Sequence, residues 1–136
     1  MKRLIVIALL ALSTTLLFAA PAAEEEGMKV GISKIASHPA LDAVEQGIQD
    51  GIAEKGYTDV QYDLQNANGD MTSAISIASK FENDQVSAAV GIATPTSQAL
   101  VQALTDIPVV FTAVTDPVSA DLVPSLGASG TNVTGY

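Results

Sequence analysis

Apolar residues follow two different periods along this chain, and the two periods alternate. Short apolar runs of the kind that form strands lie at residues 28–33, 60–64, 86–92 and 107–113. Between these runs, apolar residues recur at spacings of three and four, which is the period of a helix with one buried face. The first such helix is expected to open at Pro39 and to end near Gly56. The second is expected to start at an Asp70 cap, and the third after Thr94-Pro95.

This alternation of strands and helices predicts right-handed βαβ units and a parallel sheet. We therefore expect an α/β fold, built as an open doubly wound parallel sheet with strand order 2-1-3-4. Residues 131–136 have the pattern of a further strand, and residues 121–123 that of a short helical piece. Ligands of such sheets bind beyond the carboxyl ends of the strands, at the switch point between strands 1 and 3. This rule selects the loops at residues 33–39, 93–97 and 112–117.

The N-terminal segment has the layout of a secretory signal peptide. Two basic residues precede an apolar run that ends at Phe18, and small residues follow before an acidic stretch. We expect residues 1–22 to be a signal peptide, residues 23–27 a tether, and residues 28–136 the folded domain; an uncleaved anchor is the alternative. This signal predicts a periplasmic or extracellular protein. Because the chain has no cysteine to carry a lipid, we expect that it is not a lipoprotein.

Charge and missing motifs exclude several functions. Without Lys2 and Arg3, four basic residues face fifteen acidic ones, a balance that repels phosphate backbones. Gly-rich dinucleotide and phosphate loops and the Gly-x-Ser-x-Gly elbow are absent, so we expect no cofactor. His38 is the sole histidine and lacks partner ligands, which favours a loop or capping residue over a metal site. The acidic residues of the first helix are expected to form a solvated face: Asp42, Glu45, Asp50 and Glu54.

The three loops at the carboxyl ends are rich in hydroxyl groups. If Thr94 caps its helix, the amides of Thr96, Ser97 and Gln98 are free, and such a helix N-terminus suits a carboxylate. The Thr96 and Ser97 hydroxyls would add donors, and Asp116 would accept a hydrogen bond from an ammonium group. The alternative is an ordinary helix start at Thr94 and an ordinary turn at Asp116. A third hypothesis is an α/β enzyme that pairs Asp116 with His38.

Five segments in order resemble the ABC-transporter substrate-binding protein family that includes tryptophan- and tyrosine-binding members. They lie at residues 38–42, 65–70, 93–99, 108–117 and 130–135. The resemblance covers the whole chain after the signal. It implies a type I, periplasmic-binding-protein-like fold of two lobes, which captures a ligand without chemistry and delivers it to a membrane permease. Members of the family are longer, so the chain corresponds to the N-terminal lobe, with the second lobe missing.

The resemblance also implies a ligand site. Six residues would surround an amino-acid-like ligand there: Ser33, Thr94, Thr96, Ser97, Thr115 and Asp116. A single lobe is expected to bind such a ligand weakly, because tight capture needs burial of most of the ligand surface. Two alternatives to an importer component remain open. One is an extracytoplasmic ligand-sensing domain of a signalling receptor, and the other is a truncated fragment without function.

Overall fold

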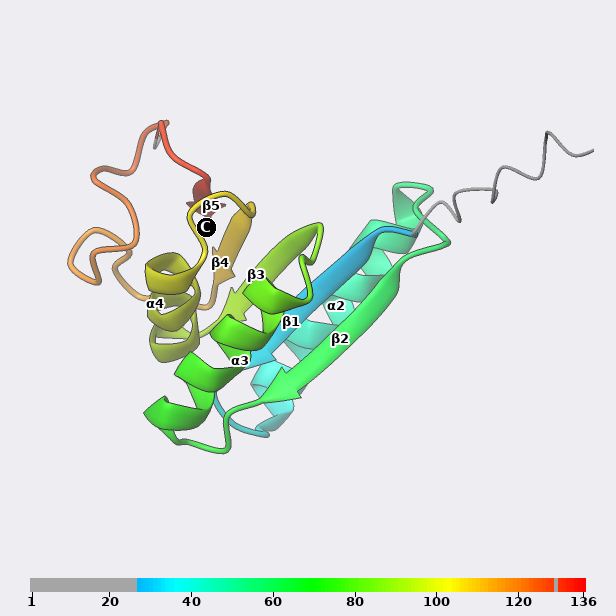
Figure 1. Ribbon diagram of the computed structural model, residues 1–136, viewed down its shortest axis with the longest axis horizontal. Coiled ribbons are helices and arrows are strands. Elements are labelled where there is room, and N and C mark those ends of the chain that lie inside the picture. Colours follow the sequence, from blue (N-terminus) through cyan, green and yellow to red (C-terminus); the bar gives the residue numbers. More distant parts are fainter. Residues whose placement is uncertain (1–26, 129) are drawn as a thin grey trace, which may run out of the picture.

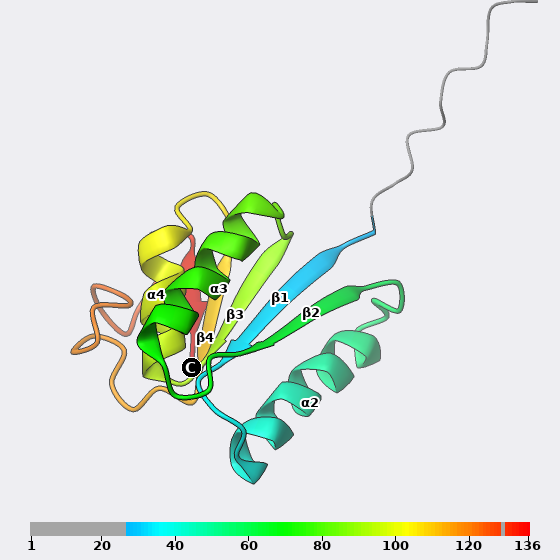
Figure 2. The same ribbon diagram turned by 60° about the horizontal axis from the view of Figure 1, so that its bottom comes forward.

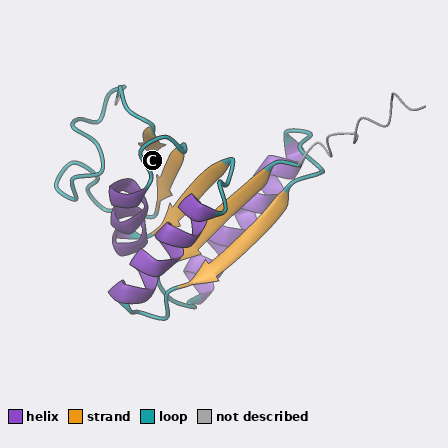
Figure 3. Ribbon diagram, viewed as in Figure 1, coloured by secondary structure: helices purple, strands orange, loops and turns teal. Residues whose placement is uncertain are grey.

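Strands and helices alternate along the chain in a computed structural model that describes residues 27–128 and 130–136 (Figures 1 and 3). The elements are β1 (Lys29–Lys34), α2 (Pro39–Glu54), β2 (Gln61–Asn66), α3 (Met71–Asn83), β3 (Ala88–Ile92), α4 (Thr94–Ala103), β4 (Val109–Thr112) and β5 (Val133–Gly135). All four expected strands and all three expected helices are confirmed. The signal peptide and most of the tether lie outside the described residues.

The helix boundaries follow the expected capping chemistry. The carboxylate of Asp70 accepts a hydrogen bond from the amide of Ser73 at 2.6 Å, so Asp70 caps α3. Gly56 follows α2 with φ +92°, a conformation that glycine adopts without a steric penalty. The expected helical piece at residues 121–123 is wrong, because a turn over residues 117–121 takes its place. Asp121 has φ +56°, which does not continue a right-handed helix.

The sheet is parallel throughout, with strand order β2-β1-β3-β4-β5. This confirms the predicted order 2-1-3-4, and β5 adds the expected further strand beside β4. Because every strand runs in the same direction, all carboxyl ends meet at one edge of the sheet. The arrowheads of β1, β2 and β3 point toward that edge in Figure 1.

The helices form two unequal layers. Figure 2 shows α3 and α4 on one face of the sheet and α2 on the other. The larger part of the core lies under α3 and α4, where Phe81, Leu100 and Leu104 are almost fully buried. Gly31 of β1 lets Phe81 approach, since a Cβ on Gly31 would lie 2.7 Å from the Phe81 ring. On the opposite face, α2 covers Val30, Ile32, Val90 and Ile92, and no residue within α2 itself is fully buried.

Candidate functional site

The turn from β3 into α4 stands at the switch point of the sheet. Strand β3 ends at Ile92, and Ala93 is the N-cap of α4 with φ 78° and ψ 160°. The expectation that Thr94 caps the helix is wrong by one residue. The reason is that the first hydrogen bond of the helical ladder runs from the Ser97 amide to the Ala93 carbonyl oxygen, at 3.2 Å.

This shift changes which amides are free at the start of α4. A helix leaves its first four N–H groups without partners in its own ladder. Here the Ala93 amide donates to the carbonyl oxygen of Thr112, and Pro95 has no N–H. The amides of Thr94 and Thr96 have no hydrogen-bond partner among residues 27–128 and 130–136. The free amides are therefore those of Thr94 and Thr96, and the Ser97 amide is internal.

The hydroxyls of Thr96 and Ser97 point into the protein. Both residues are fully buried. Thr96 Oγ1 donates to the carbonyl oxygen of Ile92 at 2.7 Å, and Ser97 Oγ lies 2.8 Å from the carbonyl oxygen of Ala93 and 3.1 Å from that of Gly91. The expectation that these two side chains donate to a ligand is therefore wrong, because the backbone uses their hydrogens.

Ser33 lies at the carboxyl end of β1, opposite Gly91 in the parallel register. Residues paired across strands share a face, and a Cβ on Gly91 would lie 2.6 Å from Ser97 Oγ. Ser33 therefore faces the layer that holds the first turn of α4. Ser33 is 1% exposed, and its Oγ has no hydrogen-bond partner among the described residues. Buried hydroxyls of this kind are rare in folded proteins, where they usually contact water or a ligand.

Asp116 organises the loop that follows β4. Its Oδ1 accepts hydrogen bonds from the amides of Val118 and Ser119 at 3.1 and 3.0 Å, and its Oδ2 accepts one from Ser119 Oγ at 2.6 Å. The hydrogen bonds from Ser119 and Val118 hold the pKa of Asp116 below its usual range. This is the turn-initiating arrangement, and it leaves part of the exposed carboxylate open to solvent. Thr115 beside it is also exposed.

Left-handed backbone conformations gather at the carboxyl ends of the strands. Asn68 follows β2 with φ 53°, Ala93 follows β3, and Ala113 follows β4 with φ 55°. Asparagine adopts this conformation readily, but alanine does not, and such residues cost of order 1–3 kcal/mol each. Strained residues of this kind concentrate at binding and catalytic sites. Two of the three loops selected from the sequence therefore carry strain where they leave the sheet.

One cluster at this edge escaped the sequence reasoning. Lys34 Nζ at the end of β1 forms ion pairs with Asp42 Oδ1 at 2.7 Å and Glu45 Oε1 at 2.9 Å. The side chains of Lys34 and Glu45 are only 12% and 13% exposed, so Glu45 does not belong to a solvated face as expected. Hydrogen bonds with Asp42 and Glu45 raise the pKa of Lys34. The available signal was the three-residue spacing of Asp42 and Glu45, which places them on one side of a helix.

His38 is a capping residue, as expected. Its Nδ1 accepts a hydrogen bond from the amide of Ala40 at 3.2 Å, at the N-cap of α2. The described part of the chain contains no group of three or more histidine, cysteine, aspartate or glutamate residues that would hold a metal ion. Asp116 bonds to its own turn, so it shows no arrangement with His38 that would support acid–base chemistry.

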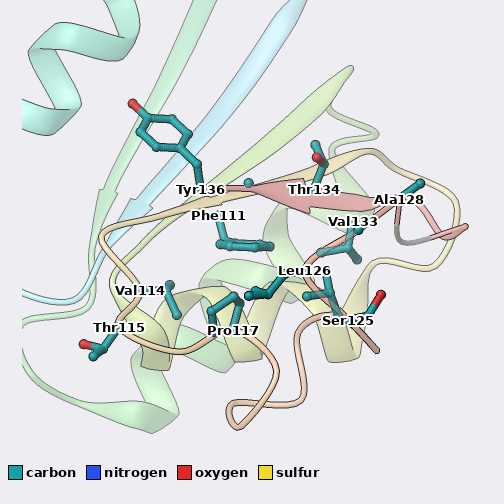
Figure 4. A pocket seen from close by; sticks show the side chains of 13 residues that line it. Phe111, Val114, Thr115, Pro117, Ser125, Leu126, Ala128, Val133, Thr134 and Tyr136 are labelled. Carbon is teal, nitrogen blue, oxygen red and sulfur yellow. The ribbon is translucent and has the colours of Figure 1, made fainter.

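A hollow lies between β4, β5 and the loop that connects them, as Figure 4 shows. It is a cavity of about 420 Å³ with a mostly apolar lining that includes Phe111, Leu126 and Val133. Phe111 and Leu126 face each other across it, whereas the Tyr136 ring points away. Sequence reasoning did not find this cavity, since its walls come together only when β5 pairs with β4 and the loop between them folds over.

Comparison with known proteins gives the class to which this arrangement belongs. Residues 29–136 match the family model described as "ABC transporter substrate binding protein". A tyrosine-binding protein of Clostridioides difficile (strain R20291) is 46% identical over 109 residues, which are 78% of this chain and 32% of that protein. The chain therefore belongs to the ABC transporter substrate-binding protein family and spans about a third of that relative's length.

Solved structures agree with this assignment. A conserved domain protein from Vibrio cholerae O1 biovar El Tor is 50% identical, with a TM-score of 0.79 over 81% of this chain and 38% of that one. An ABC domain from Streptococcus pneumoniae in complex with L-Trp is 42% identical, with a TM-score of 0.74 over 79% of this chain and 36% of that one. The fold is periplasmic-binding-protein-like, and the chain resembles one part of these larger proteins.

Proposed function

We propose that this protein is the solute-binding component of an ABC importer, and that it captures a small amino-acid-like ligand outside the cytoplasmic membrane for delivery to a permease. The observation that carries the proposal is the start of α4. The amide of Thr94, a partly exposed residue, has no hydrogen-bond partner among the described residues and stands there at the switch point of a parallel sheet. A helix N-terminus carries roughly half a positive charge, so this end suits a carboxylate.

The other loops supply what an amino acid needs besides a carboxylate site. Asp116 is exposed, and its lowered pKa keeps it ionised at neutral pH, so it would accept a hydrogen bond from a ligand ammonium. Thr115 lies beside Asp116. On β1, Ser33 has a buried hydroxyl that has no hydrogen-bond partner among the described residues. Thr96 and Ser97 are fully buried, so both contribute by shaping the turn through their hydrogen bonds to backbone carbonyl groups. Relatives named for tyrosine binding and solved with L-Trp support an aromatic amino acid as ligand.

The proposal includes export. Residues 1–22 have the pattern of a signal peptide, residues 23–27 would be a tether, and residues 28–136 would form a ligand-binding lobe. Among residues 27–128 and 130–136, no helix is long and apolar enough to cross a bilayer. The substrate-binding family supports an extracytoplasmic location and partnership with a permease.

Nuclear magnetic resonance on the ¹⁵N-labelled chain tests the ligand site directly. Titration with L-tryptophan should shift the amide signals of Thr94 and Thr96, whereas L-tryptophanamide, which lacks the carboxylate, should leave them in place. The amide of Gln102, in the last turn of α4, serves as an internal control. Because the lobe covers one side of a ligand, we expect weak affinity. Shifts confined to the cavity around Phe111, or no shifts, would contradict the proposal.

A further inference from the structure

Ala93 has a conformation that residues with a side chain rarely adopt. Its φ of 78° and ψ of 160° lie in a region that glycine favours. Strand β3 ends directly before this residue and α4 begins directly after it. The Ala93–Thr94 peptide therefore decides where the first free amide of the helix points.

Both polar backbone atoms of Ala93 are held by the protein. The amide donates to the carbonyl oxygen of Thr112 at 3.0 Å. The carbonyl oxygen accepts from the Ser97 amide at 3.2 Å and from Ser97 Oγ at 2.8 Å, and Thr96 Oγ1, whose shorter bond goes to the Ile92 carbonyl oxygen, lies 3.2 Å from it. Because N–H and C=O point in opposite directions in a trans peptide, these bonds turn the Thr94 amide away from the helix.

We infer that Ser97 and Thr96 are positioning residues whose hydrogen bonds keep Ala93 strained, so that the Thr94 amide faces a ligand carboxylate. This inference rests on the proposed function and gives it a mechanism. Without these bonds, Ala93 would relax to a negative φ, and the Ala93–Thr94 peptide would rotate. A carbonyl oxygen would then face the edge of the sheet and repel a carboxylate.

Ser33 gives an independent reason to place a ligand group here. Ser33 is 1% exposed, its buried hydroxyl has no partner among the described residues, and its side chain faces the layer that holds the first turn of α4. It makes no hydrogen bond to Ser97 or Thr96, so it takes no part in holding Ala93. A buried hydroxyl left without a partner on the sheet face that α4 covers points to a polar ligand, or to a water that the ligand orients.

A mutant cycle on the full chain tests the inference. Ser97→Ala removes a hydrogen bond to Ala93, and Ala93→Gly removes the strain. We expect Ser97→Ala to weaken the L-tryptophan response of the Thr94 amide about tenfold. In the Ala93→Gly background the same change should cost less than twofold, because glycine adopts the required conformation without help. Ser79→Ala, on the exposed side of α3, is the control and should change neither response.

The outcomes separate the inference from the proposed function. Equal losses from Ser97→Ala in both backgrounds would overturn the positioning role. If the wild-type Thr94 amide does not respond to L-tryptophan, the proposed function fails. The strain argument is then judged by melting temperature alone. Ser97→Ala should lower it more in the Ala93 background than in the Ala93→Gly background, and equal decreases would overturn the argument. If Ser97→Ala does not fold, Thr96→Val takes its place in the cycle.

Discussion

The amide of Ala93 donates a hydrogen bond to the carbonyl oxygen of Thr112 at 3.0 Å, one residue beyond the last β3 residue paired with β4. This bond carries the pairing past the end of β3 and ties the first turn of α4 to the end of β4. Ala113, the residue after Thr112, is itself left-handed. The proposed site would use the loops after β3 and β4 for opposite ends of an amino acid, and this hydrogen bond links the points where those two loops begin. Substitutions at this junction should therefore affect both.

Gly91→Ala should destabilise the protein and disturb the site together. The new Cβ would lie 2.7 Å from the Cα of Ser97 and 2.9 Å from its amide nitrogen, so α4 must move away from the sheet. We expect a loss of about 2 kcal/mol in the free energy of unfolding, measured by urea denaturation. Gly47→Ala is the matched control, because a Cβ there meets nothing within 4 Å. That change should stabilise α2 by about 0.5–1 kcal/mol, and equal effects at both glycines would refute the close packing.

Lys34→Met should destabilise the attachment of α2. It leaves the largely buried Glu45 carboxylate without its cation, and we expect a loss of about 3 kcal/mol in unfolding free energy. Lys55→Met, at an exposed lysine with no ion pair among the described residues, should have little effect. A second change, Glu45→Leu, should restore most of the stability lost with Lys34→Met. If it does not, the burial of the pair is not the cause.

Alkaline pH should weaken the same attachment. The pKa of Lys34 is raised above its usual 10.5 by hydrogen bonds with Asp42 and Glu45. The stabilisation is therefore fully present below pH 10.5 and is lost as the pH rises through the higher folded pKa. Melting temperatures of wild type and Lys34→Met should converge above that value. A difference between the two proteins that does not depend on pH would argue against the charge.

Asp116→Asn tests the proposed ammonium contact. Asparagine keeps an oxygen for the amides of Val118 and Ser119 but carries no charge, so the turn should persist. The response to L-tryptophan should fall, whereas the response to indole-3-propionate, which lacks the ammonium, should not. Because the pKa of Asp116 lies below its usual 3.8, the wild-type response should stay constant from pH 7 down to that value. Equal losses for both ligands would assign Asp116 to the turn alone.

Asn132→Ala should destabilise the segment between α4 and β4. The side-chain amide of Asn132 donates to the carbonyl oxygens of Leu104 and Ile107, each at 2.8 Å. Removing it leaves two carbonyl groups without this partner, and we expect a loss of about 1–3 kcal/mol in unfolding free energy. Asn83→Ala, at the exposed end of α3, is the control for loss of an asparagine. Comparable losses at the two positions would contradict the bridging role.

The order of elements was predictable from the sequence, for local reasons. The apolar period assigned strands and helices, and the handedness of βαβ units then fixed the order β2-β1-β3-β4. Capping chemistry is also local, so the start of α3 at Asp70 and the end of α2 near Gly56 were correct. The rule for carboxyl ends of parallel strands selected the loops that include Ala93 and Ala113, which prove to be strained.

Tertiary structure alone decided what each side chain in those loops does. The hydroxyls of Thr96 and Ser97 read as ligand donors in the sequence, but the approach of α4 to Gly91 turns them toward backbone carbonyl groups. Burial of Glu45 beside Lys34 likewise depends on how α2 docks on the sheet. A sequence specifies which donors and acceptors a segment carries. Which of them stay free depends on the geometry that packing imposes. The partners of Thr96 and Ser97 lie within six residues along the chain, but the docking of α4 against Gly91 decides that the two hydroxyls meet those carbonyl groups and no ligand.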